Sequence, residues 1–214
     1  MKNSRKAEAK KPWGKPDGRH AHSFLVNLDE ILKELQVFDA GGKILSVMDG
    51  FAGAIRLMVE AGERGHKLIF IGNGGSAAIA SHQAVDYWKN GGIEAMAFND
   101  ASLLTCIGND CGYENVFAEP MMRFAKAGDV VIAISSSGKS PNILNGVKAA
   151  RRMGCKVVGF SGFAPNNPLR SMGDLNFYVP SRAYGLVEVS HLSLIHALLR
   201  EIIYLNPKTN KGGY

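Results

Sequence analysis

Residues 69–88 read IFIGNGGSAAIASHQAVDYW, an apolar run that ends in a glycine-rich turn and continues into a helix expected from about Ala77. Glycines let backbone N–H groups approach an anion closely, and the helix N-terminus adds a favourable dipole. The turn is out of register with GxGxxG and lacks the GK[ST] of a P-loop. It therefore indicates an anion site and argues against a nucleotide site, although a plain turn remains the simpler alternative.

Five short apolar runs alternate with helical stretches along the rest of the chain. They are KLIFIG (67–72), IEAMAF (93–98), DVVIAIS (129–135), KVVGFSG (156–162) and LNFYVP (175–180). Several are continuously apolar, which is typical of strands buried on both faces of a parallel sheet. This alternation predicts an α/β fold, an αβα sandwich with right-handed crossovers.

Helical periodicity marks both ends of this region. In SFLVNLDEILKELQVF (23–38), Phe24, Leu28, Ile31, Leu32 and Leu35 are spaced as on one helix face. Further helices are expected over about 43–64 and 185–204. The predicted organisation is one domain over 22–205, a basic and disordered tail over 1–21, and a C-terminal tail over 206–214.

Composition limits the class of protein. The chain has 214 residues and a net charge of +6, but its first 20 residues hold seven Lys/Arg against two Asp/Glu and supply +5 of it. The fold itself is thus close to neutral, and nucleic acid is not an expected partner. Cys106, Cys111 and Cys155 have no CxxC spacing, which favours a reducing compartment. No stretch has the length of a membrane span or a signal peptide, so a cytoplasmic protein without membrane contact is expected.

A second loop combines four hydroxyls with a helix start. Ser135, Ser136, Ser137 and Ser140 follow the run DVVIAI, and Pro141 suits the first position of a helix. One serine would suffice as a helix cap. Four serines with several backbone amides favour binding of a phosphate ester.

Two helices carry candidate catalytic groups. His82 and Asp86 are four residues apart and share a face, which suits two metal ligands, an acid/base pair, or a simple surface hydrogen bond. On the last helix, His191 and His196 lie about 60° and 80° to opposite sides of Glu188. Both histidines cannot then face one pocket, and this geometry alone does not choose between them.

Taken together, GNGGS followed by His82, IGND at 107–110 and SSSGKSPN at 135–142 resemble the SIS (sugar isomerase) domain family. Within it they look like the phosphoheptose isomerases, which interconvert sedoheptulose 7-phosphate and a heptose 7-phosphate. The resemblance covers about 24–204. It implies a five-stranded parallel αβα sandwich and a homotetramer in which N-terminal helices pack and the active sites lie between subunits.

The resemblance also assigns residues to roles. The serine loop would bind the sugar phosphate, and the substrate would be lined by Asn73, Gly74, Gly75, Asn109 and Asp110. By the family motif, the metal-binding or catalytic residues are expected to be His82, Asp86, Glu188 and His196. The resemblance therefore favours His196 over His191 as the functional histidine of the last helix. Asp86 stands where the family has a glutamate and Glu188 where it has a glutamine. The more anionic cluster favours a divalent ion such as Zn²⁺.

The expected reaction is an aldose–ketose isomerisation through an enediol, with His196 as the acid. Two residues remain candidates for the base: Asp86, because of its position in the family motif, and Glu188, because its side chain reaches further. The alternative is a non-catalytic SIS module that binds a sugar phosphate or a protein partner, as the DnaA-binding members of this branch do.

Overall fold

The computed structural model describes residues 15–206, so the expected tails fall largely outside the described residues. A seven-stranded sheet in the order β2-β1-β7-β6-β5-β3-β4 forms the middle layer. The strands are β1 (Gln36–Asp39), β2 (Ile44–Leu45), β3 (Leu68–Gly72), β4 (Ala95–Ala97), β5 (Val130–Ser135), β6 (Lys156–Ser161) and β7 (Leu175–Tyr178). Strands β3 to β7 pair in parallel, as the five apolar runs predict.

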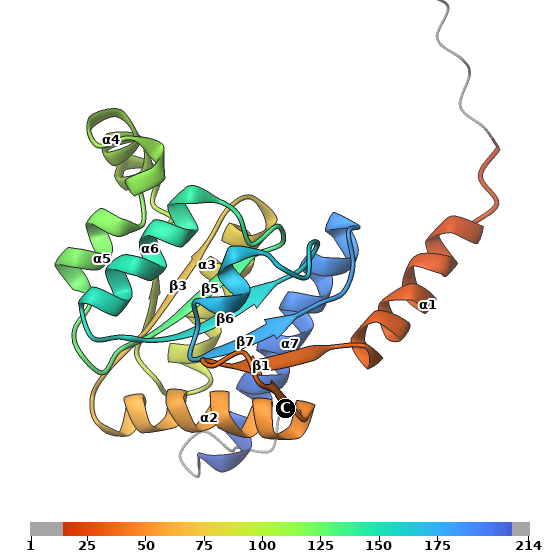
Figure 1. Ribbon diagram of the computed structural model, residues 1–214, viewed down its shortest axis with the longest axis horizontal. Helices are drawn as coiled ribbons and strands as arrows, with labels where there is room; N and C mark the ends of the chain where they lie inside the picture. The colour runs from red at the N-terminus through yellow and green to blue at the C-terminus, as the bar shows by residue number, and fades with distance from the viewer. Residues whose placement is uncertain (1–14, 207–214) are drawn as a thin grey trace, which may run out of the picture.

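Helices cover both faces of the sheet (Figure 1). One core lies under α2 (Val47–Glu63), α3 (Gly75–Lys89) and α7 (Tyr184–Leu205), and the other under α5 (Ala118–Phe124) and α6 (Pro141–Arg152). Alternate residues of β3 serve the two cores: Leu68 and Phe70 enter the first, whereas Ile69 and Ile71 enter the second. Successive side chains of a strand point to opposite faces of the sheet, so a core lies on each face. This arrangement confirms the αβα sandwich.

The helical spacing of Phe24 to Leu35 corresponds to a helix that ends before Leu35. Helix α1 (Arg19–Lys33) begins three residues before His22, the expected start of ordered structure, and the chain then turns into β1. Strand β1 pairs antiparallel with β7 and with β2, which adds two strands to the five parallel ones. Val37 and Phe38 are buried there, so pairing along the sheet edge outweighs the helical spacing that ends at Leu35.

Two helices stand apart from the sandwich. Helix α1 projects away from the body, and none of its residues is buried, although it contacts α7 (Figure 1). Helix α4 (Ala101–Asp110) lies beyond the sheet edge and also has no buried residue. Both helices therefore present side chains that the rest of this chain does not cover.

The connections define where a ligand would bind. From β3 the chain passes to β4 on one side, then returns to β5 on the other side of β3 and continues outward through β6 and β7. The gap between the ends of β3 and β5 is therefore the topological switch point, where open α/β sheets bind their ligands. The glycine loop follows β3 and the serine loop follows β5, so both loops meet at this point.

Candidate active site

The glycine loop places the last helix against the start of α3. Gly74 precedes α3 with φ +54°, a conformation that glycine adopts without strain. A Cβ atom added to Gly75 would lie 2.6 Å from the carboxylate of Glu188 on α7. The absence of a side chain at Gly75 thus lets Glu188 approach the N-terminus of α3, where the helix dipole favours a negative charge.

The serine loop keeps hydroxyls available to a ligand. Ser136 is buried, and its Oγ has no hydrogen-bond partner among the described residues. Ser140 precedes α6, but its side chain makes no capping hydrogen bond, so the helix-cap explanation does not hold for it. Ser135 accepts a hydrogen bond from the N–H of Gly138 at 3.2 Å. The loop therefore contains more hydroxyl groups than its own structure uses.

A pair of amides joins the two loops. Asn73 Nδ2 donates to Asn142 Oδ1 at 2.9 Å, and Asn142 Nδ2 donates back to Asn73 Oδ1 at 2.8 Å. Asn142 is buried and also accepts from the N–H of Ile143. Sequence reasoning missed Asn142 as a site residue, although it lies within the SSSGKSPN motif, because only the fold brings it beside Asn73.

The two loops enclose a cavity of about 110 Å³. Its lining contains hydroxyl and amide groups and one carboxylate, and no Lys or Arg: Asn73, Ser76, Ile134, Ser135, Ser136, Ser137, Ser140, Tyr184 and Glu188. All four serines of the predicted phosphate loop thus line one space together with Asn73. Neutral donors at a helix N-terminus are a usual way to hold a phosphate.

Three of the four expected metal ligands come together. Single ligand atoms of His82, Asp86 and His196 all lie within 4.8 Å of one another. His82 Nε2 is 3.3 Å from Asp86 Oδ2, and the rings of His82 and His196 are 5.6 Å apart. Two imidazoles and a carboxylate form the three-ligand set of a catalytic Zn²⁺ site with an open position, so the donor chemistry fits this ion.

Glu188 does not join this group. It precedes His196 by eight residues on α7, which is about 12 Å along the helix axis, and it lines the serine cavity instead. Within one chain, the two carboxylates proposed as alternative bases therefore occupy different places. Asp86 lies beside the histidines, and Glu188 lies beside the serines.

Asn109 and Asp110 are not brought to the cavity. Both are exposed at the end of α4, where Asn109 Nδ2 donates to Asp110 Oδ1 at 2.8 Å. Neither residue lines the space between the loops in this chain. Their assignment to substrate binding stays a prediction.

His191 belongs to the core. It is fully buried, its ring lies edge-on to Phe160, and its Nε2 is 3.2 Å from the carbonyl oxygen of Ser161. Burial lowers the pKa of His191 to about 4, although the hydrogen bond to Ser161 opposes this shift. His191 is thus a neutral structural residue, and His196 is the histidine of α7 that faces α3.

This burial predicts a pH-dependent stability. The unfolded chain protonates His191 near pH 6.5, whereas the folded protein keeps it neutral down to about pH 4, so the free energy of unfolding falls as the pH drops through this window. The loss is on the order of 3 kcal/mol. Urea unfolding at pH 7 and pH 4.5 should show a smaller loss for His191→Gln than for the wild type. The exposed-site control His20→Gln should follow the wild type, and equal losses in all three proteins would contradict the prediction.

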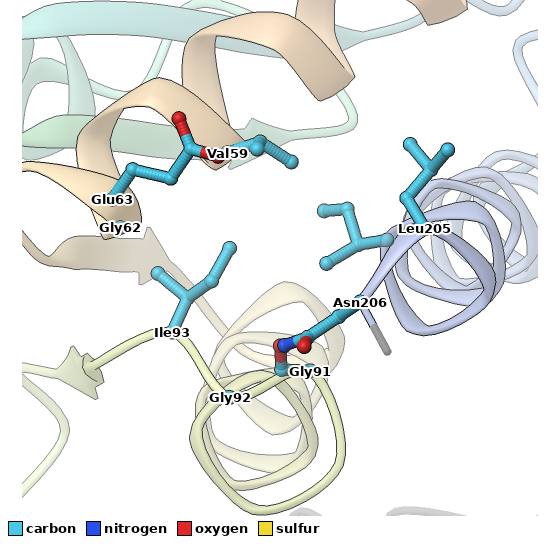
Figure 2. Close-up of a pocket in the computed structure, with 9 residues that line it drawn as sticks. Val59, Gly62, Glu63, Gly91, Gly92, Ile93, Leu205 and Asn206 are labelled. Atoms are coloured by element: carbon cyan, nitrogen blue, oxygen red, sulfur yellow. The ribbon is translucent and has the colours of Figure 1, made fainter. Parts of the chain in front are cut away.

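A larger cavity of about 340 Å³ lies away from this site (Figure 2). It is formed by the end of α2, the loop after α3 and the end of α7, and it includes Glu63, Ile93 and Asn206. The residues from α2 and from the loop precede β3 and β4, so this cavity lies at the amino ends of the strands, opposite the switch point at their carboxyl ends. Glu63 is the one acidic or basic residue in its lining. Its chemistry therefore offers less for catalysis than the loops do.

The two helices that carry the candidate groups run side by side in the same direction. Gly75 meets Glu188 and His82 meets His196, and Gly91, just after the end of α3, meets Leu199, so the contacts follow chain order on both segments. The line along which α3 and α7 meet therefore leads from the serine cavity to the His82–Asp86–His196 group. Among residues 15–206, no helix has the length and hydropathy of a membrane span.

Comparison with known proteins agrees with this arrangement. Residues 43–162 match the model of the SIS domain family. The chain is 36% identical over 185 residues to a phosphoheptose isomerase of Aliarcobacter butzleri, covering 84% of this chain and 93% of the relative. A second phosphoheptose isomerase, from Geobacter sp. strain M21, is 34% identical over 80% of this chain and 93% of its own length.

A solved structure extends the similarity to the fold. The phosphoheptose isomerase GmhA of Neisseria gonorrhoeae superposes with a TM-score of 0.77 at 29% identity, covering 87% of this chain and 98% of that one. The sequence motifs, the αβα fold and these relatives agree. The chain belongs to the SIS domain family, in the branch formed by the phosphoheptose isomerases.

Proposed function

We propose that this protein is an aldose–ketose isomerase that interconverts sedoheptulose 7-phosphate and D-glycero-heptose 7-phosphate. The relatives named above are called phosphoheptose isomerases, which supports an isomerase that acts on a heptose phosphate. The observation that carries the proposal is the alignment of the serine cavity and the His82–Asp86–His196 group along α3 and α7.

The spacing of these two places suits a long sugar. Ser76 and His82 are six residues apart on α3, about 9 Å along the helix axis. A seven-carbon chain has six C–C bonds of about 1.5 Å each. Its extended span is somewhat shorter than their sum, and the phosphate ester lengthens the molecule to a comparable distance. A triose has two such bonds and could not extend from the serine cavity to the histidines.

Each group has a definite role in the proposed reaction. Ser135, Ser136, Ser137 and Ser140 hold the phosphate through hydroxyls and the amides at the start of α6. Asp86 removes a proton from C1 of the ketose and returns it to C2, so that an enediol forms and collapses to the aldose. His196 protonates the carbonyl oxygen at C2 as that proton leaves C1, and then takes a proton from the C1 hydroxyl.

A Zn²⁺ ion held by His82, Asp86 and His196 would polarise the carbonyl group when bound, and His196 would then act as a ligand instead of as the acid. No electrons leave the substrate in this reaction, so no redox cofactor is needed. Glu188 is kept as the alternative base because its side chain is one methylene longer than that of Asp86, although it lines the cavity that would hold the phosphate end of the sugar.

We also propose that the protein works as a homotetramer with sites between subunits. Two observations support this arrangement: the His82 side chain is 59% exposed, and Trp88 beyond it is 53% exposed. Helix α1 buries none of its own residues in this chain. Asn109 and Asp110 would then contact substrate bound to a neighbouring subunit. The three thiols are unpaired in the structure, which supports a cytoplasmic location.

The decisive experiment is proton exchange in D₂O. The protein incubated with sedoheptulose 7-phosphate should incorporate deuterium at C1 and produce the aldose, both measured by NMR. Unphosphorylated sedoheptulose should react far more slowly, and other C5 to C8 ketose phosphates establish the length preference. Chelation should stop exchange and added Zn²⁺ should restore it. Saturable protection against thermal unfolding without any exchange would instead show a binding module.

A further inference from the structure

Gln83 is a buried polar residue next to the proposed metal group. Its side chain is fully buried on α3, and its Nε2 lies 2.9 Å from Nε2 of His196. Its other amide atom, Oε1, is buried with no hydrogen-bond partner. A buried amide oxygen without a partner costs about 1–3 kcal/mol. An apolar side chain would avoid this cost if Gln83 served only to pack α3 against α7.

The contact determines which ring nitrogen of His196 is available. Gln83 occupies Nε2, so Nδ1 is the nitrogen left to bind an ion. A neutral imidazole carries its proton on one nitrogen and a lone pair on the other. When the Gln83 N–H donates to Nε2, the ring proton is on Nδ1, and this nitrogen has no lone pair to offer.

A half-turn of the amide reverses this arrangement. Gln83 Oε1 then faces Nε2 and accepts a hydrogen bond from its N–H, which leaves the lone pair on Nδ1. Histidines that bind metals usually donate their second N–H to an oxygen in this way. The atom that lacks a partner in one orientation of Gln83 is thus the atom that prepares His196 for a metal in the other.

We propose that Gln83 is a positioning residue that selects the tautomer of His196 and thereby permits metal binding through Nδ1. This inference rests on the metal site of the proposed function, but it does not require that the protein isomerise a sugar. The orientation of the Gln83 amide and the binding of a metal are then coupled, because the ion is bound only when Oε1 accepts the hydrogen bond from His196.

The chain offers a matched control on the same two helices. Tyr87 is buried on α3, and its hydroxyl donates to the carbonyl oxygen of Ile195 on α7 at 3.1 Å. Replacement of Tyr87 by Phe removes one polar contact between α3 and α7 and leaves the bond between Gln83 and His196 in place. Gln83→Met removes the amide at similar size and keeps the space filled.

The test is a Co²⁺ titration of the metal-free proteins, followed by visible absorption. Gln83→Met should bind Co²⁺ about 10- to 100-fold more weakly than the wild type, with a melting temperature that is equal or higher. Tyr87→Phe should bind as the wild type does. Gln83→Glu, whose carboxylate can only accept from Nε2–H, should recover most of the affinity.

Nitrogen NMR of the His196 ring measures directly which ring nitrogen carries the proton. The zinc-loaded wild type should carry the proton on Nε2, whereas Gln83→Met should not show this fixed tautomer. Affinity of Gln83→Met within twofold of the wild type, tighter binding by this variant, or no binding by the wild type would each overturn the proposal. These are binding measurements, so their failure is distinct from a failure to exchange protons with the sugar.

Discussion

Replacement of Asp86 by Asn is expected to lower the turnover of sedoheptulose 7-phosphate by about a hundredfold or more. Asp86 is the carboxylate beside His82 and His196, and an amide cannot take the substrate proton. Loss of a general base typically costs a factor of 10² to 10⁴. The KM should change less, because in the proposed function the serine loop, and not Asp86, holds the phosphate. Steady-state rates of aldose formation, with circular dichroism to check folding, measure the effect.

Two companion variants separate the possible roles of carboxylates. Glu188→Gln removes the charge from the serine cavity and restores the residue type of the family, so turnover should stay within about tenfold of the wild type. Asp29→Asn removes an exposed carboxylate that pairs with Lys33 on α1 and should have no effect on turnover. Metal content is measured in each variant, because Asp86 is also a proposed ligand. Near-normal turnover of Asp86→Asn with a large loss in Glu188→Gln would make Glu188 the base.

The central sheet was predictable because its strands are buried on both faces. The runs that became β3, β5 and β6 are short, largely apolar and bounded by glycine turns, which favours buried strands over helices. The antiparallel strands β1 and β2 were missed because their signal is short. Gln36–Asp39 continues the spacing of α1, and only pairing with β7 makes it a strand. The sequence AGGK at 40–43 marks the turn that joins β1 to β2 and was the available clue.

The sequence predicts those parts of the site that lie within one segment of the chain. It does not predict the parts that form where two distant segments meet. Both loops are local motifs, and His82 and Asp86 share one helix turn, so their proximity follows from spacing alone. Asn142 and Gln83 acquire their roles through partners 69 and 113 residues away. Helical geometry alone did not decide whether His191 or His196 faces the site. The structure separates them because the ring of one enters the core and the ring of the other meets α3.

Replacement of Gly138 by Ala is expected to weaken substrate binding by about 10- to 100-fold. Gly138 lies in the serine loop with φ +62°, and an added Cβ would collide with the side chain of Asn167. Asn167 cannot easily move, because its amide donates to Gly162 and Ala164 and accepts from the N–H of Arg170. The loop must therefore shift, and the hydroxyls that are proposed to bind the phosphate move with it.

The magnitude follows from the number of phosphate contacts at risk. A hydrogen bond to a charged group contributes about 1.5–3 kcal/mol, and each 1.4 kcal/mol corresponds to tenfold in affinity. Loss of one such bond thus accounts for the expected range. It should appear as a raised KM and as weaker protection of the protein by inorganic phosphate in thermal unfolding.

Gly42→Ala is the matched control for this variant. Gly42 has φ +80° in the turn between β1 and β2, and an added Cβ would meet nothing within 4 Å. Both variants place alanine in the left-handed region, at a cost of about 1–2 kcal/mol, but only Gly138→Ala forces the serine loop to move. Equal phosphate binding by the two variants would show that the serine loop does not hold the phosphate. A selective loss in Gly138→Ala would locate the phosphate at the N-terminus of α6, where the four serines and the switch point of the sheet coincide.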